Sequence, residues 1–326
     1  MPFSLLIGSL AGAAAAVVLM ASVRSAQSIG PLLLVIAPLP GLIAGLGWGL
    51  ASAIAAALAG AAVMAFAGGA KLGLAHILFI GAPCALLAHL AFLSRPLPPT
   101  AASATPGRDW YPAGRLLAAI GLVGGTLPVV LLPMIGDTYA VLAEPFALLL
   151  RTIGASAPAD SGLAWLRTAG DAEIARYARA LVRATPAALA AYWTIFFAIN
   201  FYLAGRITRA SGRLARDWPD LPGLVVPPAL LGLFAAALAA MFVAGTPAVI
   251  GTSLAGALAV VFVMAGLAVV HAIARGRWPW LVWAVYCSLM LTVIGAGVAL
   301  IVLAIGIVEP VLNLRRRLPP QRPTGT

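Results

Sequence analysis

Few side chains in this sequence could do chemistry, and most of them stand within or beside long apolar runs. Asn200 lies well inside the run AAYWTIFFAINFYLAGRI, and Tyr202 follows two residues later. A polar side chain at this position is expected to face other helices rather than lipid. It would make either an interhelical hydrogen bond or a contact with a ligand. We keep both alternatives and treat Asn200 and Tyr202 as candidate ligand-binding residues.

Sequence motifs of nucleotide-binding and hydrolytic enzymes are absent. The sequence has no GxxxxGK[ST], HExxH, CxxC or GxSxG pattern, and its histidines, His76, His89 and His271, are far apart. Cys84 and Cys287 both lie in apolar runs, which indicates small buried side chains rather than a disulfide. We therefore expect no enzymatic activity, no cofactor and no bound metal.

The stretch VIAPLPGLIAGLGWG, residues 35–49, combines apolar side chains with many residues that weaken helices. Irregular backbone is tolerated in a membrane only where it lines a cavity or packs against other helices. In transporters, Gly- and Pro-interrupted segments point to the substrate site. A ligand cavity and a tight turn between packed helices remain equal alternatives. For the cavity, the candidate ligand-binding residues are Pro38, Pro40, Gly41, Gly45, Gly47 and Trp48.

The composition of the chain requires a lipid environment. Of its 326 residues, 63% are apolar and 9% are charged, whereas about a quarter of the residues of a soluble domain are charged. Apolar runs recur at about the 20-residue length that crosses ~30 Å of hydrocarbon. They cover approximately residues 4–22, 31–47, 49–67, 73–93, 115–135, 187–206, 225–244, 248–272 and 279–312. We predict an all-α, polytopic transmembrane helical bundle with about eight to ten membrane segments.

The positions of Lys and Arg predict the orientation of these segments. Arginines follow the fourth, sixth and eighth runs, so these loops and the N-terminus are predicted to be cytoplasmic. The net charge of +11 is explained by such loops and does not indicate nucleic acid. Arginines 315–317 should also be cytoplasmic, so we expect Gly295 and Gly297 to break the last run into two passes. Glu309, near the end of that run, is expected to snorkel.

The apolar runs divide the chain into four parts. These are N-terminal membrane helices with the broken Pro/Gly segment (1–135), an outer insertion (136–185), C-terminal membrane helices (186–314) and a cytoplasmic tail (315–326). Residues 171–183, DAEIARYARALVR, have apolar side chains at helical spacing and predict an amphipathic helix on the outer membrane surface. Thr185 and Pro186 would then begin the next helix as cap and first-turn residue.

Two sets of residues are candidate partner-docking sites. The stretch RITRASGRLARDWPDLP spaces its arginines by three, four and three, so a continuing helix would place them all on one face. They would contact lipid headgroups or a cytoplasmic partner, and they are Arg206, Arg209, Arg213 and Arg216. In the first run, Gly8, Gly12 and Ala16 repeat at four-residue spacing, as do Ala11 and Ala15. This spacing allows close helix approach, either within the bundle or with a partner subunit.

Four stretches spread over nearly the whole chain carry a family resemblance: APLPGLIAGLGWG, NFYLAGRITRASGRLARDWPDL, HAIARGRW and LNLRRRL. They resemble the YybS-like family, a domain-of-unknown-function family of bacterial membrane proteins. That family is distantly similar to the substrate-binding S components of energy-coupling-factor vitamin transporters. The resemblance implies an S-component-like core whose PxP-then-glycine stretch is matched by Pro38, Pro40, Gly41, Gly47 and Gly49. Ala11 and Ala15 match the small-residue motif that docks the coupling subunit.

The leading hypothesis is a protein of the bacterial cytoplasmic membrane that binds a small organic ligand from the outer side. It would be transporter-like, without its own ATPase, and would need a coupling or partner membrane subunit for active uptake. The alternative is a non-transporting scaffold or assembly protein that docks a partner through its arginine-rich cytoplasmic loops.

Overall fold

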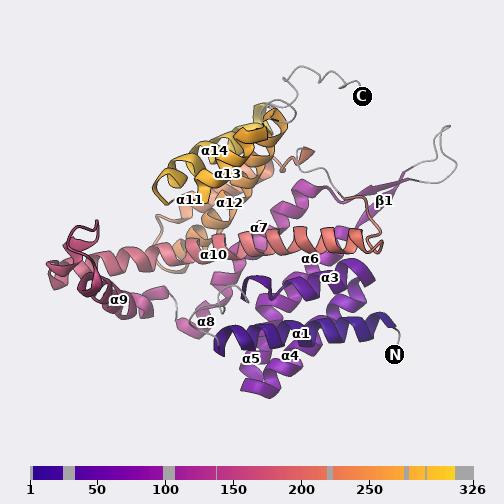
Figure 1. The fold of residues 1–326 in the computed structure, drawn as a ribbon, viewed down its shortest axis with the longest axis horizontal. Helices are drawn as coiled ribbons and strands as arrows, with labels where there is room; N and C mark the ends of the chain where they lie inside the picture. Colours follow the sequence, from indigo (N-terminus) through magenta and orange to yellow (C-terminus); the bar gives the residue numbers. More distant parts are fainter. Residues whose placement is uncertain are drawn as a thin grey trace. The chain divides into compact units, whose positions relative to one another are not determined.

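A computed structural model of the protein describes residues 3–24, 34–97, 107–136, 138–218, 223–274, 279–290 and 292–312. These residues are almost entirely helical, which confirms the predicted all-α bundle (Figure 1). The elements are α1 (Phe3–Arg24), α3 (Leu39–Trp48), α4 (Leu50–Gly68), α5 (Ala70–His76), the π-helix η1 (Ile77–Gly81), α6 (Ala82–Phe92), β1 (Ser94–Pro96), β2 (Arg108–Trp110), α7 (Ala113–Val130), α8 (Leu132–Ile135), η2 (Tyr139–Leu142), α9 (Ala143–Ser156), η3 (Ala164–Arg167), α10 (Asp171–Ala210), α11 (Ala229–Ala240), α12 (Thr246–Ala274), α13 (Pro279–Met290) and α14 (Thr292–Leu312).

Several of these helices are long and apolar enough to cross a membrane. Within the described residues there are seven such helices, and α5, η1 and α6 together form one of them. Two shorter apolar helices, Leu34–Trp48 and Ala229–Ala240, accompany them. The seven long helices confirm a polytopic bundle, and the predicted number of eight to ten membrane segments stays a prediction.

The chain forms two compact units, each built from segments that are separate in sequence. The first unit comprises Met1–Ile120, Ile195–Pro228 and Val261–Thr326, and the second comprises Gly121–Thr194 and Ala229–Val260. Helices α7, α10 and α12 each contribute one part to either unit. The boundaries of the two units therefore do not coincide with those of the four continuous parts expected from the sequence.

Small residues bring the N-terminal helices of the first unit into close contact. A Cβ atom on Gly8 would collide with the carbonyl oxygen of Ser52, and one on Gly12 with that of Ala56. Both contacts advance by four residues in the same direction, so α1 and α4 are parallel. Helix α3 packs against α1, α4 and α6 (Figure 1). The glycine repeat of the first run therefore serves packing within the bundle.

The C-terminal run is not broken at Gly295 and Gly297 as expected. Both glycines lie inside α14, which runs from Thr292 to Leu312. The expected break of the run into two passes at these glycines is therefore wrong. Arginines 315–317 lie outside the described residues.

Helix α14 runs antiparallel to the C-terminal part of α12. Gly266 lies against the backbone of Val302, and Gly306 lies against the backbone of Phe262. A return pass of a hairpin would have to run parallel to α12 instead. Glu309, one turn after Gly306, is buried with 3% of its surface exposed. The expectation that it snorkels is therefore also wrong, because a snorkelling carboxylate would keep its charged end exposed.

Helix α10 continues through the expected boundary at Thr185 and Pro186. It has 40 residues and contains Pro186 in its interior. The Thr185 hydroxyl donates to the carbonyl of Leu181 at 2.9 Å, so it bonds backward within the helix instead of capping a new one. At about 1.5 Å per residue the helix is roughly twice as long as the hydrocarbon is thick. Its charged first half therefore extends beyond the bilayer, and the interfacial placement of residues 171–183 stays a prediction.

The second unit is also held together by close backbone approach. Gly124 lies against the backbone of Thr194, and Gly256 lies against that of Ala187. The Ser253 hydroxyl donates to the Gly125 carbonyl at 2.6 Å. These contacts join α7, α10 and α12 in this unit, because each glycine leaves room for a neighbouring main chain.

Candidate functional site

A cavity of about 440 Å³ lies in the first unit between parts of α7, α10, α12 and α13. This volume falls within the ~300–1,000 Å³ typical of small-molecule sites. Its walls are almost wholly apolar and aromatic. They are formed by Ala113, Leu116, Leu117, Ile120, Ala198, Ile199, Phe201, Tyr202, Leu203, Trp218, Leu224, Met264, Leu267, Ala268, His271 and Tyr286.

The chain leaving α10 forms one wall of this cavity. Gly212 has a φ of 68° and ends the helix, and the N–H of Arg213 donates to the Thr208 carbonyl at 3.0 Å. This is the usual way in which glycine terminates a helix. The chain then turns back, and Trp218 packs over Gly205, where any Cβ atom would collide with the indole ring. Trp218 also stacks on Phe201, with ring centroids 6.1 Å apart.

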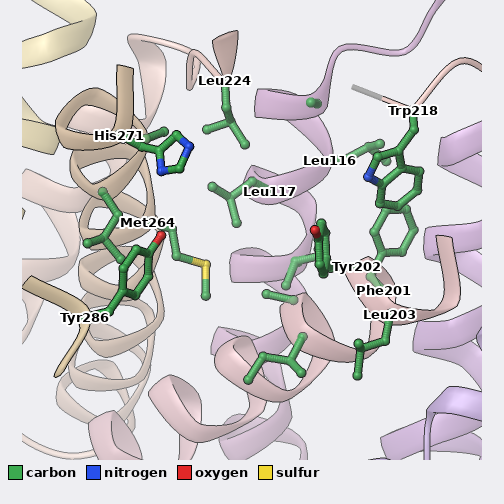
Figure 2. Close-up of a pocket in the computed structure, with 16 residues that line it drawn as sticks. Leu116, Leu117, Phe201, Tyr202, Leu203, Trp218, Leu224, Met264, His271 and Tyr286 are labelled. Atoms are coloured by element: carbon green, nitrogen blue, oxygen red, sulfur yellow. The ribbon is translucent and has the colours of Figure 1, made fainter. Parts of the chain in front are cut away.

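A few polar groups interrupt the apolar walls. Figure 2 shows His271 and Tyr286 on one side of the cavity, with Tyr202 and Trp218 across from them. The Tyr202 hydroxyl accepts a hydrogen bond from an Nη of the exposed Arg206 at 3.3 Å. The guanidinium of Arg206 also lies 6.0 Å from the Tyr202 ring centroid. The site thus combines a hydrocarbon-like interior with one cation held beside it.

The cavity does not lie along the Pro/Gly stretch predicted to form one. Of the eight candidate ligand-binding residues, only Tyr202 lines it. Pro38 and Gly41 face Cys84 instead: the Cys84 thiol donates to the Pro38 carbonyl at 3.6 Å, and a Cβ on Gly41 would lie 3.6 Å from the sulfur. A Cβ on Gly45 would come within 2.6 Å of the Ala88 Cβ. Of the two alternatives, the contacts in this stretch favour close packing.

The prolines interrupt the helix there, and Asn200 bonds the main chain beside the interruption. Pro38 and Pro40 have no N–H, so the carbonyl four residues before each proline loses its usual helical donor. The Asn200 side-chain nitrogen donates to the Val35 carbonyl at 2.6 Å and to the Phe196 carbonyl at 2.8 Å. Asn200 is fully buried. Its interhelical hydrogen bond is therefore present, as one of the two alternatives predicted.

The end of the stretch meets the residues predicted to dock a partner. A Cβ on Gly47 would lie 3.4 Å from the methyl carbon of Thr208. The guanidinium of Arg213 lies 4.8 Å from the ring centroid of Trp48, within the range of a cation–π contact. Trp48 is thus covered by Arg213 and does not open into the cavity. These contacts tie α3 to the turn after α10.

The four arginines do not share one helical face, because α10 ends at Ala210. Arg206, Arg209 and Arg213 are exposed, whereas Arg216 has only 6% of its surface exposed. Its Nη atoms donate to the carbonyls of Ala91 at 2.9 Å and Tyr111 at 3.2 Å. Arg216 therefore bonds main-chain groups at the end of α6 and just after β2, and is not available to a partner.

Burial changes the pKa of the Arg216 guanidinium. Desolvation lowers its pKa below the ordinary value, and the neighbouring Asp217 carboxylate partly opposes this. The side chain nevertheless stays charged, as arginine does throughout proteins. Its hydrogen bonds are then charge-assisted, which makes them stronger than neutral ones.

The predicted docking pair on α1 points into the protein. Ala15 has 2% of its surface exposed and Ala11 is half-buried. Ala15 lies beside His76 and Cys84 around a gap of only about 10 Å³. A partner helix cannot reach Ala15 without displacing these helices. The prediction that Ala15 docks a partner is therefore wrong, because its face of α1 is already covered.

The sequence analysis missed the aromatic residues that form the cavity. Trp218 and Tyr286 lie far from Tyr202 in sequence, and Phe201 was not singled out. His271 was noted only as an isolated histidine. The one available signal was the gathering of aromatic residues near arginines at run ends, which is typical of a membrane interface. No cluster of His, Cys, Asp and Glu in the described part of the chain could hold a metal ion.

Comparison with protein-family models, curated proteins and solved structures gave no match. The resemblance to the YybS-like family and to S components therefore stays a prediction.

Proposed function

We propose that this protein is a multi-pass protein of the bacterial cytoplasmic membrane that binds a small organic molecule in the α7–α10–α12–α13 cavity. It is transporter-like and has no ATPase of its own. The observation that carries the proposal is the cavity itself, with its apolar walls and its Tyr202–Arg206 pair. A concave apolar site with a few convergent polar groups is the usual form of a ligand-binding site.

The cavity also changes the side from which the ligand is proposed to bind. It is lined by the first residues of α7 and by residues near the ends of α10 and α12. These are the helix ends that carry Arg115 and Arg206, which the positive-inside rule assigns to the cytoplasm. We therefore place binding in the cytoplasmic half of the membrane, with the N-terminus cytoplasmic, instead of on the outer side.

The test of ligand binding is co-purification from native membranes with mass spectrometry of both small molecules and proteins. We expect one small molecule per protein in the wild type. Leu117→Trp should lose it, because the indole enlarges a buried side chain that lines the cavity. Leu122→Trp is the matched control on an exposed face of the same helix. A wild-type protein without a bound small molecule would refute the proposal.

A scaffold function is the second candidate, and the exposed arginines support it. Arg206, Arg209 and Arg213 stand together around the end of α10, where a cytoplasmic partner with acidic groups could bind them. The same co-purification distinguishes the two functions. A stoichiometric protein partner without a small molecule, lost on replacing Arg209 and Arg213 with Gln, would establish the scaffold.

The proposed orientation is tested by cysteine labelling with a membrane-impermeant reagent. A cysteine at Gly212 should be protected in intact cells, and one at Ser161 should be labelled. Labelling at Gly212 from outside would overturn the proposed side of the cavity.

A further inference from the structure

We propose that the ligand of the cavity is an anionic amphiphile, with one hydrocarbon chain and a carboxylate or phosphate headgroup. The inference rests on the proposed ligand-binding function and names the chemical class that the site takes. It follows from three properties of the site: its walls, the cation beside them and the position of both along the helices.

The walls select a hydrocarbon chain. Leu116, Leu117, Leu267 and Ala268 present only apolar groups to the interior, and Met264 adds a flexible apolar side chain. A polar metabolite such as a sugar would leave most of its hydroxyl groups without hydrogen-bond partners there, because few polar atoms line the walls, and such burial is costly. A hydrocarbon chain has no such groups, so it gains from the burial of its surface.

The cation selects an anionic headgroup. Arg206 is exposed, and among the described residues its side chain donates a hydrogen bond to the hydroxyl of Tyr202. None of the ion pairs within the described residues includes it. The guanidinium therefore keeps donors free, and its planar fork matches a carboxylate or a phosphate. Tyr202 holds this cation beside the apolar interior, because it touches both.

The positions of these groups fit a molecule that lies at the membrane boundary. Arg206 is four residues before the end of α10 at Ala210. Phe201, Tyr202 and the returning Trp218 lie beside it, with centroids of Tyr202 and Trp218 6.0 Å apart. Aromatic rings gather at membrane–water interfaces, where one end of a side chain is apolar and the other is wet. An amphiphile would lie with its headgroup at Arg206 and its chain among the leucines.

The experiment compares three probes on the full-length protein in a non-ionic detergent. Palmitate carries both the chain and the charge, hexadecanol carries the chain alone, and inorganic phosphate carries the charge alone. Native mass spectrometry counts the bound molecules, and thermal unfolding reports the stabilisation. We expect one palmitate per protein with a raised Tm, about tenfold weaker binding of hexadecanol, and no effect of phosphate.

Variants at two neighbouring arginines assign the charge contact. Arg206→Gln should weaken palmitate to the level of hexadecanol without changing hexadecanol binding, and Arg206→Lys should restore part of the difference. Arg209→Gln is the control, since Arg209 is exposed on the same helix and does not line the cavity. It should bind palmitate like the wild type.

The outcomes separate this inference from the proposed function. Equal binding of palmitate and hexadecanol, or no change in Arg206→Gln, would refute the anionic headgroup while leaving a ligand-binding cavity. Failure of both chain-bearing probes to bind would refute the amphiphile class. The cavity function would then still stand if a co-purified molecule is lost in Leu117→Trp.

Discussion

The first unit contains two regions that are similarly apolar but differ in how much space they enclose. In the N-terminal bundle of α1, α3, α4 and α6, the gap beside His76 measures about 10 Å³. Between α7, α10, α12 and α13 the cavity measures about 440 Å³. A water molecule needs on the order of 10–15 Å³ of such space. The gap beside His76 is therefore too small for an organic ligand, whereas the cavity can hold one.

The difference comes from the size of the side chains at the contacts. Gly8, Gly12 and Gly45 allow main chains and Cβ atoms to meet in the N-terminal bundle, which leaves no space. The cavity is bounded by leucines and aromatic rings that hold its helices apart. Glycine and proline in a membrane segment therefore do not by themselves indicate a ligand site. Here they mark a packed region in which Asn200 donates to the Val35 carbonyl beside the interrupted helix.

The largest effect is expected from filling the closed region at Gly12. Gly12→Leu would drive a side chain into the backbone of Ala56, and a main chain cannot move aside as a side chain can. We expect a loss of stability at or above the ~1–3 kcal/mol typical of overpacking. Ala14→Leu, on the exposed face of α1, is the control. Equal thermal unfolding of both variants in detergent would contradict the packing described for α1 and α4.

The next largest effect is expected at Arg216, which borders both regions. Arg216→Gln removes charge-assisted hydrogen bonds to the carbonyls of Ala91 and Tyr111. The free energy of unfolding should fall by about 1.5–3 kcal/mol. Arg209→Gln should leave it nearly unchanged, because Arg209 is exposed. Thermal unfolding of the two variants measures the difference, and an Arg216→Gln variant as stable as Arg209→Gln would show that these hydrogen bonds do not stabilise the fold.

Much of the fold, but little of the site, could be predicted from the sequence. Apolar runs predict helices, because each span in lipid must hydrogen-bond its own main-chain groups. The polar Asn200 within such a run predicted an interhelical hydrogen bond as one of two alternatives. The cavity could not be predicted, because it depends on which helices become neighbours and on the path after Gly212. Nothing local indicates that Trp218 returns over Gly205. The continuity of α10 through Pro186 was missed because soluble-helix rules place proline at a first turn.

A smaller effect is expected at Asn200. Asn200→Leu removes the hydrogen bond to the Val35 carbonyl. Interhelical hydrogen bonds in membranes contribute about 0.6–1.7 kcal/mol, so a loss of stability in that range is expected. The cavity ligand should remain bound, because Asn200 does not line the cavity. Thermal unfolding should thus show a lower stability, while mass spectrometry shows an unchanged ligand occupancy. Loss of the ligand without loss of stability would contradict this prediction.

The smallest effects, of opposite sign, are expected from alanine at two glycines of α3. Gly45→Ala should destabilise, because its Cβ would lie 2.6 Å from the Ala88 Cβ. Gly47→Ala has 3.4 Å to the nearest atom, so it should be neutral or gain up to ~1 kcal/mol of helix propensity. Thermal unfolding of both variants compares them directly. If Gly47→Ala destabilises the protein and Gly45→Ala does not, the close contact described for Gly45 is contradicted.

The most direct test of the central claim is to compare ligand occupancy in two variants, one from each region. Leu117→Trp alters the cavity wall, and Gly47→Leu adds bulk to the Pro/Gly stretch. Each protein is purified from native membranes, and mass spectrometry measures the small molecule retained per folded protein. The account predicts that Leu117→Trp is empty while Gly47→Leu retains the wild-type amount. Loss in Gly47→Leu with full retention in Leu117→Trp would contradict it and move the ligand site to the stretch around Gly47.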